Sequence, residues 1–318
     1  MSATLRRPLA LLSVLAALTA AGCGGTDTSD ANESAQPTSD QTTQAADVAK
    51  VRENLDALVA AAGTDQLLQF YAGPPGTMIV VESDPGADES ALVRYRLDTG
   101  TTEVAAPEDY PMTGSFANTP LTAGDIDLDA LLSHNYGCDA PGLNVATVGW
   151  QAATVTASCE DSEDPASYWL SDLAPIELEV TDADSVTDAM TRLAAGSSGE
   201  VTSFMIVLNG TATLSDGTEI PYSNVQIGLK DGTRVRDLEV NDKGWTRGTG
   251  RVDAADYLSV PMAELDVDGL LECAAQLKEQ VGEDSGSVYV NVHEDSVTWE
   301  FRDKEGTVYM TDTNCQPL

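Results

Sequence analysis

The most regular array of side chains that could do chemistry is an alternation of acidic and aliphatic residues that occurs twice. The first copy places Asp125, Asp127 and Asp129 at alternate positions, and residues 264–268 repeat it. Calcium loops use carboxylates at alternate positions, but they also need a glycine at position six and a glutamate at position twelve. The first copy has neither. The three aspartates therefore form a weak metal candidate, and the spacing favours a last acid that caps a helix between aliphatic residues of the core.

A second candidate is the glycine-rich segment 243–251, which concentrates positive charge in a strongly acidic chain. Its charged and aromatic side chains are Lys243, Trp245, Arg247 and Arg251. Arginine side chains hydrogen-bond well to anions, and a tryptophan ring can stack on a sugar. The segment lacks the GKS or GKT of a phosphate-binding P-loop. It indicates an anion or sugar contact, and the alternative is a loop that neutralises neighbouring acids within the fold.

A third candidate is a group of aromatic residues around the first pair of cysteines after the N-terminal region. Its members are Tyr136, Trp150, Tyr168 and Trp169. Exposed aromatics beside a disulfide-held loop can form a hot spot for a partner or a platform for a glycan. The alternative, which is the commoner use of aromatic residues in a domain of this size, is a place in the core.

The sequence gives little support for catalysis. It contains no GxSxG, HExxH or SxxK signature, and we expect His134 and His293 to be solvent-exposed side chains. Acidic residues are too numerous for one pair to be singled out as the couple of a glycosidase. We therefore predict no catalytic residue and no cofactor.

The first residues have the organisation of an export signal. Arg6 and Arg7 precede an apolar run from Leu9 to Ala21, as in the charged and apolar regions of a secretory signal. The run is shorter than the ~20 apolar residues that a membrane-spanning helix needs. It ends in Leu18-Thr19-Ala20-Ala21-Gly22-Cys23.

This ending resembles the lipobox of bacterial lipoprotein precursors. The resemblance covers residues 1–23 only, and no family is identified for the rest of the chain. It implies removal of residues 1–22, multiple acylation of Cys23, and anchoring at the extracytoplasmic face of the bacterial cell membrane. Residues 23–46 contain no large apolar side chain, so we predict a lipidated cysteine followed by a disordered tether.

The remaining cysteines are Cys138, Cys159, Cys273 and Cys315. An even number of cysteines in an oxidising compartment indicates disulfides. Four cysteines allow three pairings, of which we favour Cys138–Cys159 and Cys273–Cys315 because each closes one local unit. Zinc is the rival interpretation, but the chain has no CxxC and two histidines, so we predict no metal.

The net charge is −36, and it becomes −38 when the signal with its two arginines is removed. Nucleic-acid-binding proteins need a basic surface, so this charge excludes that class of partner. It also has the wrong sign for adhesion to anionic lipid, which leaves the Cys23 lipid as the membrane contact. The acidity favours solubility, and cation binding or a basic partner is the alternative.

The elements that must position these residues follow one order four times, a helix and then an antiparallel meander. Residues 48–62 place apolar side chains at helical spacing, and residues 125–132, 185–195 and 268–281 predict three more helices. Strands are predicted at 67–71, 77–82, 91–98, 145–151, 154–159, 168–171, 176–180, 201–208, 211–214, 220–230, 233–240 and around 288–292, 297–301 and 308–310. Asn209-Gly210, Asp216-Gly217 and Asp231-Gly232 predict tight hairpin turns.

This order predicts an α+β fold of tandem helix-plus-antiparallel-meander units in two domains, residues 47–180 and 181–318. The boundary is expected near residues 175–184, and one long composite sheet is the alternative. The chain is then a membrane-anchored surface lipoprotein, a non-enzymatic binding module for an unknown protein or envelope glycan. A small-ligand carrier or sensor and a hydrolase of cell-envelope polymers are the alternatives.

Overall fold

The structure is a computed structural model of the chain. It describes residues 48–84, 91–113, 119–138, 141–160, 165–213, 218–251, 256–281, 285–293, 296–303 and 305–318. The export signal, Cys23, the tether and the predicted turn at Asp216-Gly217 lie outside these residues. Within the described residues, no helix has both the length and the apolar character that crossing a membrane requires.

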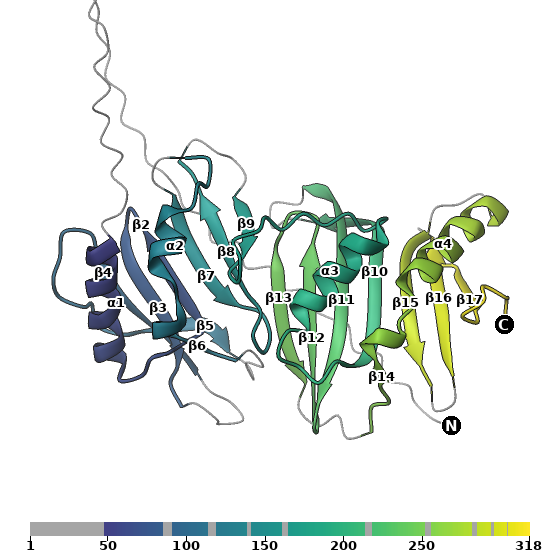
Figure 1. The fold of residues 1–318 in the computed structure, drawn as a ribbon, viewed down its shortest axis with the longest axis horizontal. Coiled ribbons are helices and arrows are strands. Elements are labelled where there is room, and N and C mark those ends of the chain that lie inside the picture. Colours follow the sequence, from purple (N-terminus) through teal and green to yellow (C-terminus); the bar gives the residue numbers. More distant parts are fainter. Residues whose placement is uncertain are drawn as a thin grey trace, which may run out of the picture. The chain divides into compact units, whose positions relative to one another are not determined.

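The structure confirms a mixed fold in which antiparallel strands predominate and helices are few (Figure 1). The first large sheet has the strand order β5-β4-β3-β2-β7-β8-β9. The elements of this part are α1 (Val48–Ala62), β2 (Gln69–Gly73), β3 (Gly76–Glu82), β4 (Ala91–Asp98), β5 (Glu108–Thr113), α2 (Leu128–Ser133), β7 (Gly142–Thr147), β8 (Ala153–Ser158) and β9 (Ala166–Trp169). A small separate sheet pairs β1 (Gln66–Leu67) with β6 (Leu121–Thr122).

The second large sheet has the order β13-β12-β11-β10-β15-β16-β17, and β14 pairs with β10 beside this path. Its elements are α3 (Ala183–Leu193), β10 (Glu200–Thr213), β11 (Glu219–Asp231), β12 (Arg234–Asn241), β13 (Thr246–Arg251), β14 (Val260–Pro261), α4 (Val267–Val281), β15 (Ser285–Val292), β16 (Val297–Asp303) and β17 (Val308–Thr311). The large strands thus form two sheets, and the alternative of one composite sheet is wrong. Described residues other than 211–221 form one compact unit.

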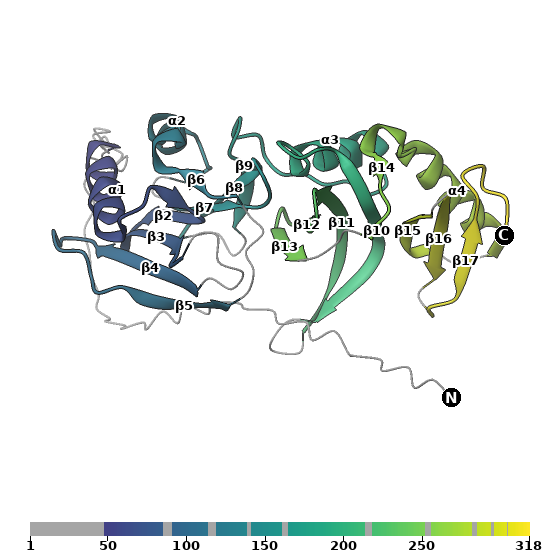
Figure 2. The same cartoon turned by 90° about the horizontal axis from the view of Figure 1, so that it is seen from below.

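The two large sheets have the same topology, so the chain contains an internal repeat. In each sheet a four-strand meander and a three-strand meander meet at a central antiparallel pair, β2–β7 in one and β10–β15 in the other. We call residues 48–176 the first repeat and residues 183–318 the second repeat. In each repeat the two helices lie on one face of the sheet (Figure 2).

The equivalence extends to single residues at the end of each repeat. After β9, Leu173 has φ 54° and the chain returns so that Tyr168 bridges Pro175. After β17, Cys315 has φ 60° and Thr311 bridges Pro317. These are the two non-glycine residues with positive φ in the described chain, and positive φ is uncommon for such residues. The bridges align Tyr168 with Thr311 and Pro175 with Pro317, and the return segment of the second repeat is one residue shorter between them.

Each repeat has a core between its helices and its sheet. Apolar residues at helical spacing on α1 and α3 face alternate residues of the strands, as binary patterning requires. Fully buried members include Leu58, Phe70, Ile79 and Val145 in the first repeat, and Val186, Leu193, Phe204 and Ile227 in the second. Gly63 and Gly196, both at positive φ, follow the ends of α1 and α3.

The turn predicted at Asn209-Gly210 is wrong, because β10 continues through both residues to Thr213. Glycine is used here for close approach and not for a turn. A Cβ atom on Gly210 would lie 2.7 Å from Val207 Cγ1 and 2.9 Å from the Tyr222 carbonyl oxygen. The turn predicted at Asp231-Gly232 is confirmed, with Gly232 at φ 59° between β11 and β12.

Two other strand predictions need correction. Residues 176–180 form no strand, although Ile176 and Leu178 pack on the second core. The apolar run there reflects packing and not sheet pairing, since the hydrophobic period cannot separate the two. Conversely, β5 was not predicted, because its sequence EDYPMT is polar and contains a proline, which is tolerated on an edge strand.

Both predicted disulfides are confirmed: Cys138–Cys159 and Cys273–Cys315, with Cα–Cα distances of 6.0 and 5.5 Å. They occupy different places in the repeat. Cys273 lies within α4, whereas Cys138 follows the end of α2. Cys138 and Cys273 therefore do not occupy equivalent positions in the two repeats. The two disulfides are thus not part of the structure that the repeats share.

Candidate binding groove

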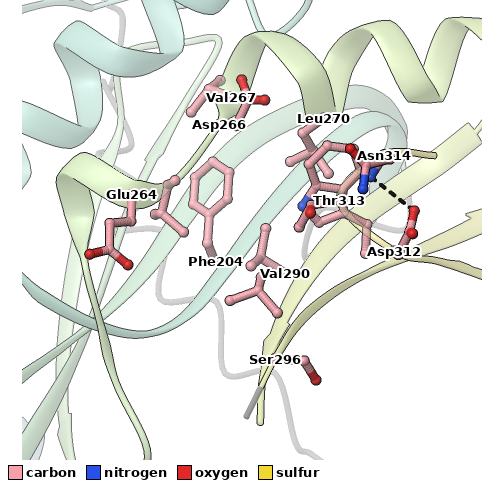
Figure 3. A pocket seen from close by; sticks show the side chains of 13 residues that line it. Phe204, Glu264, Asp266, Val267, Leu270, Val290, Ser296, Asp312, Thr313 and Asn314 are labelled. Carbon is pink, nitrogen blue, oxygen red and sulfur yellow. Dashed lines mark hydrogen bonds between the residues drawn. The ribbon is translucent and has the colours of Figure 1, made fainter. Parts of the chain in front are cut away.

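The second repeat contains an open groove with a volume of about 590 Å³ (Figure 3). It is lined by residues from three places: the strands β10, β15 and β16, the start of α4 with the 3₁₀ turn before it (Met262–Glu264), and residues 312–314 after β17. The internal fold of the repeat brings these segments to one end of the sheet. We call this feature the acidic groove.

The floor of the acidic groove is apolar. Phe204, Val290 and Trp299 face it from three neighbouring strands, and Leu270 faces it from α4. These four side chains are 5% exposed or less. The half-buried Leu265 and Val297 complete the apolar lining. The apolar surface that a bound group could reach therefore belongs mainly to Leu265 and Val297, which lie over this buried floor.

Three carboxylates stand at the edge of the groove. In the view of Figure 3, Glu264 lies to the left of Phe204 and Val290, Asp266 lies above them, and Asp312 lies to the right. Hydrogen bonds from the backbone amides of Gln316 and Asn314, each 2.9 Å long, lower the pKa of Asp312. This carboxylate is therefore ionised at neutral pH.

The chemistry of the lining is that of a site for an apolar group that carries positive charge. None of the thirteen lining residues is lysine, arginine or histidine, so nothing in the lining neutralises the three carboxylates. An apolar floor with a few polar groups at its edge is typical of ligand and partner sites. A lysine or arginine beside an aliphatic side chain would meet both kinds of surface.

The repeated acidic alternation forms helix starts. Asp127 Oδ1 accepts a hydrogen bond from the Ala130 amide, and Asp266 Oδ1 accepts one from the Gly269 amide, both at 2.9 Å. The cap is thus the middle acid of each copy, and the prediction of the last acid is wrong by two residues. Ile126 and Leu128 between the acids are buried. In the part of the chain that the structure describes, no group of three acidic, histidine or cysteine side chains could hold a metal ion.

The glycine-rich segment 243–251 forms the turn after β12 and the strand β13. Lys243, Trp245 and Arg247 are exposed, with Trp245 43% exposed, and Arg251 is the last residue of β13. Lys243, Trp245 and Arg247 are not among the residues that line the acidic groove. Their role in anion or sugar binding stays a prediction.

Gly244 in this segment is required by both its backbone and its surroundings. It is buried at φ 72°, and a Cβ atom there would lie 2.8 Å from Ser167 Cβ. We expect Gly244→Ala to destabilise the protein by about 1–3 kcal/mol in urea unfolding. Gly232→Ala is the matched control, since Gly232 has φ 59° but no atom near its missing Cβ. An equal loss for both variants would contradict the close packing at Gly244.

The segment does partly neutralise an acid of the fold. Arg247 is paired in register with Glu239 of β12. Burial raises the pKa of Glu239, and the charge of Arg247 offsets part of this effect. Glu239 Oε1 accepts hydrogen bonds from the Tyr222 hydroxyl and from Asn224 Nδ2, the latter at 2.6 Å. The pattern supports the alternative interpretation for Arg247.

A raised carboxyl pKa makes stability depend on pH. Because folded Glu239 holds its proton more tightly than unfolded glutamate, its contribution is complete below pH 4.5 and is lost as the pH rises through the folded pKa. We therefore expect Glu239→Gln to gain stability relative to the wild type between pH 4 and pH 7. Urea unfolding at a series of pH values measures this, with Glu279→Gln on the exposed side of α4 as the control. A constant difference across the series would contradict the assignment.

The aromatic group does not assemble as one exposed platform. Tyr136 is 6% exposed, its hydroxyl donates to the Leu131 carbonyl at 2.9 Å, and burial raises its pKa to about 12. Its ring makes edge contacts with Tyr168 and His134 at centroid distances of 5.1 and 4.7 Å. The core alternative is therefore correct for Tyr136, and His134 is half-buried rather than solvent-exposed.

The two tryptophans of the group contact arginines of the second repeat. Trp169 is 5% exposed and lies 5.7 Å from the Arg192 guanidinium. Trp150 is half-buried with Arg236 over its ring at 4.2 Å. Cation–π contacts of this kind are stabilising, so these rings serve contacts within the chain.

Sequence reasoning missed the acidic groove. The residues of its floor have the pattern of an ordinary core. The residues at its edge, such as Glu264 and Asp312, are far apart in the sequence. The one available signal was the second copy of the acidic alternation, where Val267 replaces the leucine of the first copy. That difference alone predicts no cavity.

Comparison with known proteins identifies no family. No model of a known protein family matches the sequence, and no curated protein matches it. Among solved structures, the DNA polymerase accessory subunit PF-8 from Kaposi's sarcoma-associated herpesvirus is 11% identical. The match covers 83% of this chain and 93% of that chain with a TM-score of 0.14, which is too low to support an inference about fold or function.

Proposed function

We propose that this protein is a lipid-anchored lipoprotein of the extracytoplasmic face of a bacterial cell membrane that binds another envelope component without catalysis. The acidic groove is the binding surface. The observation that carries the proposal is the combination of an apolar floor with three carboxylates and no basic side chain in the lining.

The anchoring part of the proposal rests on sequence. The lipobox-like ending at Cys23 follows a charged and apolar signal, and a net charge of −36 opposes adhesion to anionic lipid by any other route. Two cystines fit an oxidising compartment. We infer two domains, residues 47–180 and 181–318, each a pair of helix-plus-meander units that the tether holds away from the bilayer.

Affinity purification from membranes tests the binding part. The anchored chain is compared with Glu264→Lys, which reverses an exposed charge of the groove, and with Glu279→Lys, which reverses an exposed charge on α4 outside the groove lining. We expect a component that copurifies with the wild type and with Glu279→Lys and is lost with Glu264→Lys. Identical profiles for all three chains, or cleavage of an envelope polymer by the purified protein, would overturn the proposal.

A small-ligand carrier is the second candidate. The groove volume of about 590 Å³ lies within the range of small-molecule sites. Native mass spectrometry of the purified chain would detect such a ligand as an added mass that disappears in Glu264→Lys.

A further inference from the structure

The acidic groove lies at a place whose counterpart in the first repeat is covered. Strand register fixes the correspondence, because Phe204 pairs with Val290 as Phe70 pairs with Val145. The next strand continues it, with Val290 opposite Trp299 and Val145 opposite Val155. The floor of the groove therefore has a defined equivalent in the first repeat.

The edge of the groove has counterparts as well. The two capping aspartates align Asp266 with Asp127, and hence Glu264 with Asp125. The return segments align Asp312 with Trp169, since the amide of Asp312 donates to the Gln316 carbonyl as the amide of Trp169 donates to the Ala174 carbonyl. One edge residue is thus a buried tryptophan in the first repeat and a carboxylate in the second.

In the first repeat this end of the sheet is packed against the second repeat. Val148 and Ala152, in the turn between β7 and β8, belong to the same buried cluster as Leu193 and Leu238. The Gln151 amide donates to the Ala195 carbonyl at 3.2 Å. The equivalent turn of the second repeat, between β15 and β16, contributes Ser296 to the open groove.

The covering surface combines aliphatic side chains with arginines. Arg192 Nη1 lies 3.1 and 3.0 Å from the two carboxylate oxygens of Asp172, and its guanidinium faces Trp169. Arg236 lies over Trp150 and donates to Thr119 Oγ1 at 3.2 Å. Leu193 and Leu238 are the sequence neighbours, at one and two residues, of these arginines. Charge-assisted hydrogen bonds and cation–π contacts of arginine are among the stronger polar contacts in proteins.

We propose that the acidic groove binds a protein surface that presents arginine or lysine next to aliphatic side chains, as the second repeat does toward the first. This inference rests on the proposed binding function and specifies its partner. Charge complementarity supports it, since the groove carries three carboxylates and no basic residue. Leu258 is the counterpart of Thr119, because each lies two residues before the short strand of its repeat, β14 or β6. Thr119 contacts Arg236, whereas Leu258 is 46% exposed.

Two synthetic peptides of equal length test the proposal, one alternating leucine with arginine and one alternating leucine with glutamate. They are titrated into the Cys23→Ser chain, and the methyl NMR signals of Val290, Val297 and Leu270 report on the groove. The signals of Val145 and Val155, which occupy the equivalent positions in the first repeat, serve as the control for binding outside the groove. We expect the leucine–arginine peptide to shift the groove signals and the leucine–glutamate peptide to leave them unchanged.

Matched variants separate groove binding from general attraction to an acidic protein. Glu264→Lys and Thr313→Lys both change exposed residues of the groove, and we expect each to lower the affinity for the leucine–arginine peptide by about tenfold. We expect Glu279→Lys to leave this affinity unchanged. Equal shifts by both peptides, or no shift by the arginine peptide, would overturn the inference. If the peptide test fails but Glu264→Lys still abolishes copurification of a membrane component, the proposed binding function stands and only this inference about the partner is wrong.

Discussion

Replacing Cys23 by serine is expected to move the whole protein from the membrane fraction to the soluble fraction. The variant keeps the apolar signal but removes the thiol to which the lipid would be attached. Several acyl chains are needed for stable anchoring, and no helix of the described chain is long and apolar enough to cross a membrane. With a net charge of −36, the released protein has no electrostatic attraction to anionic lipid. Fractionation followed by immunoblotting measures the change.

Cys138→Ser is the matched control for this prediction, because it also removes one thiol but leaves the lipobox-like segment intact. It should remain with the membrane. Metabolic labelling with a fatty-acid precursor gives an independent measurement, in which the wild type is labelled and Cys23→Ser is not. Membrane-bound Cys23→Ser after a high-salt wash, or an unlabelled wild type, would contradict the anchoring proposal.

Removal of the Cys273–Cys315 cystine is expected to cause the larger of two stability losses. The bond closes a loop with a sequence separation of 42 residues, against 21 for Cys138–Cys159. The chain-entropy relation gives a loss of about 4 kcal/mol for the longer loop and about 3 kcal/mol for the shorter one. Since domains are stable by ~5–15 kcal/mol, either loss is a large fraction of the total.

The experiment replaces both cysteines of one pair by alanine, which leaves no free thiol and buries no hydroxyl at the 1% exposed position 273. Urea unfolding compares the two double variants with the oxidised wild type. Reduction of the wild type should reproduce the sum of both losses. Unchanged unfolding midpoints, or free thiols in the isolated wild type, would show that these cysteines are not paired in solution.

The sequence predicted most of the elements because burial on one face leaves a clear period. In β15 and β16, Val288, Val290, Trp299 and Phe301 alternate with polar residues and are buried as expected. Errors arose where one residue type serves two purposes. Gly210 follows an asparagine, as in a hairpin turn, but its missing side chain admits the Tyr222 backbone instead.

The acidic groove could not be predicted for a different reason. Its floor residues have the pattern of an ordinary core, and the pattern does not show that the space above them is open. The opening depends on what lies at one end of the sheet. In the first repeat that end is packed against Leu193 and Leu238, whereas the equivalent end of the second repeat forms the groove. Such a difference appears only when the two repeats are compared in three dimensions.

The most direct test of the central claim, that the acidic groove is the binding surface, is photo-cross-linking in living cells. A photoreactive amino acid is placed at Thr313, an exposed residue of the groove, or at Val308, which is 48% exposed on the edge strand β17 and lies outside the groove lining. We predict a cross-linked product from the anchored chain at position 313 that is absent at position 308 and absent when Glu264→Lys is added. Equal products at both positions, or none at position 313, would contradict the account.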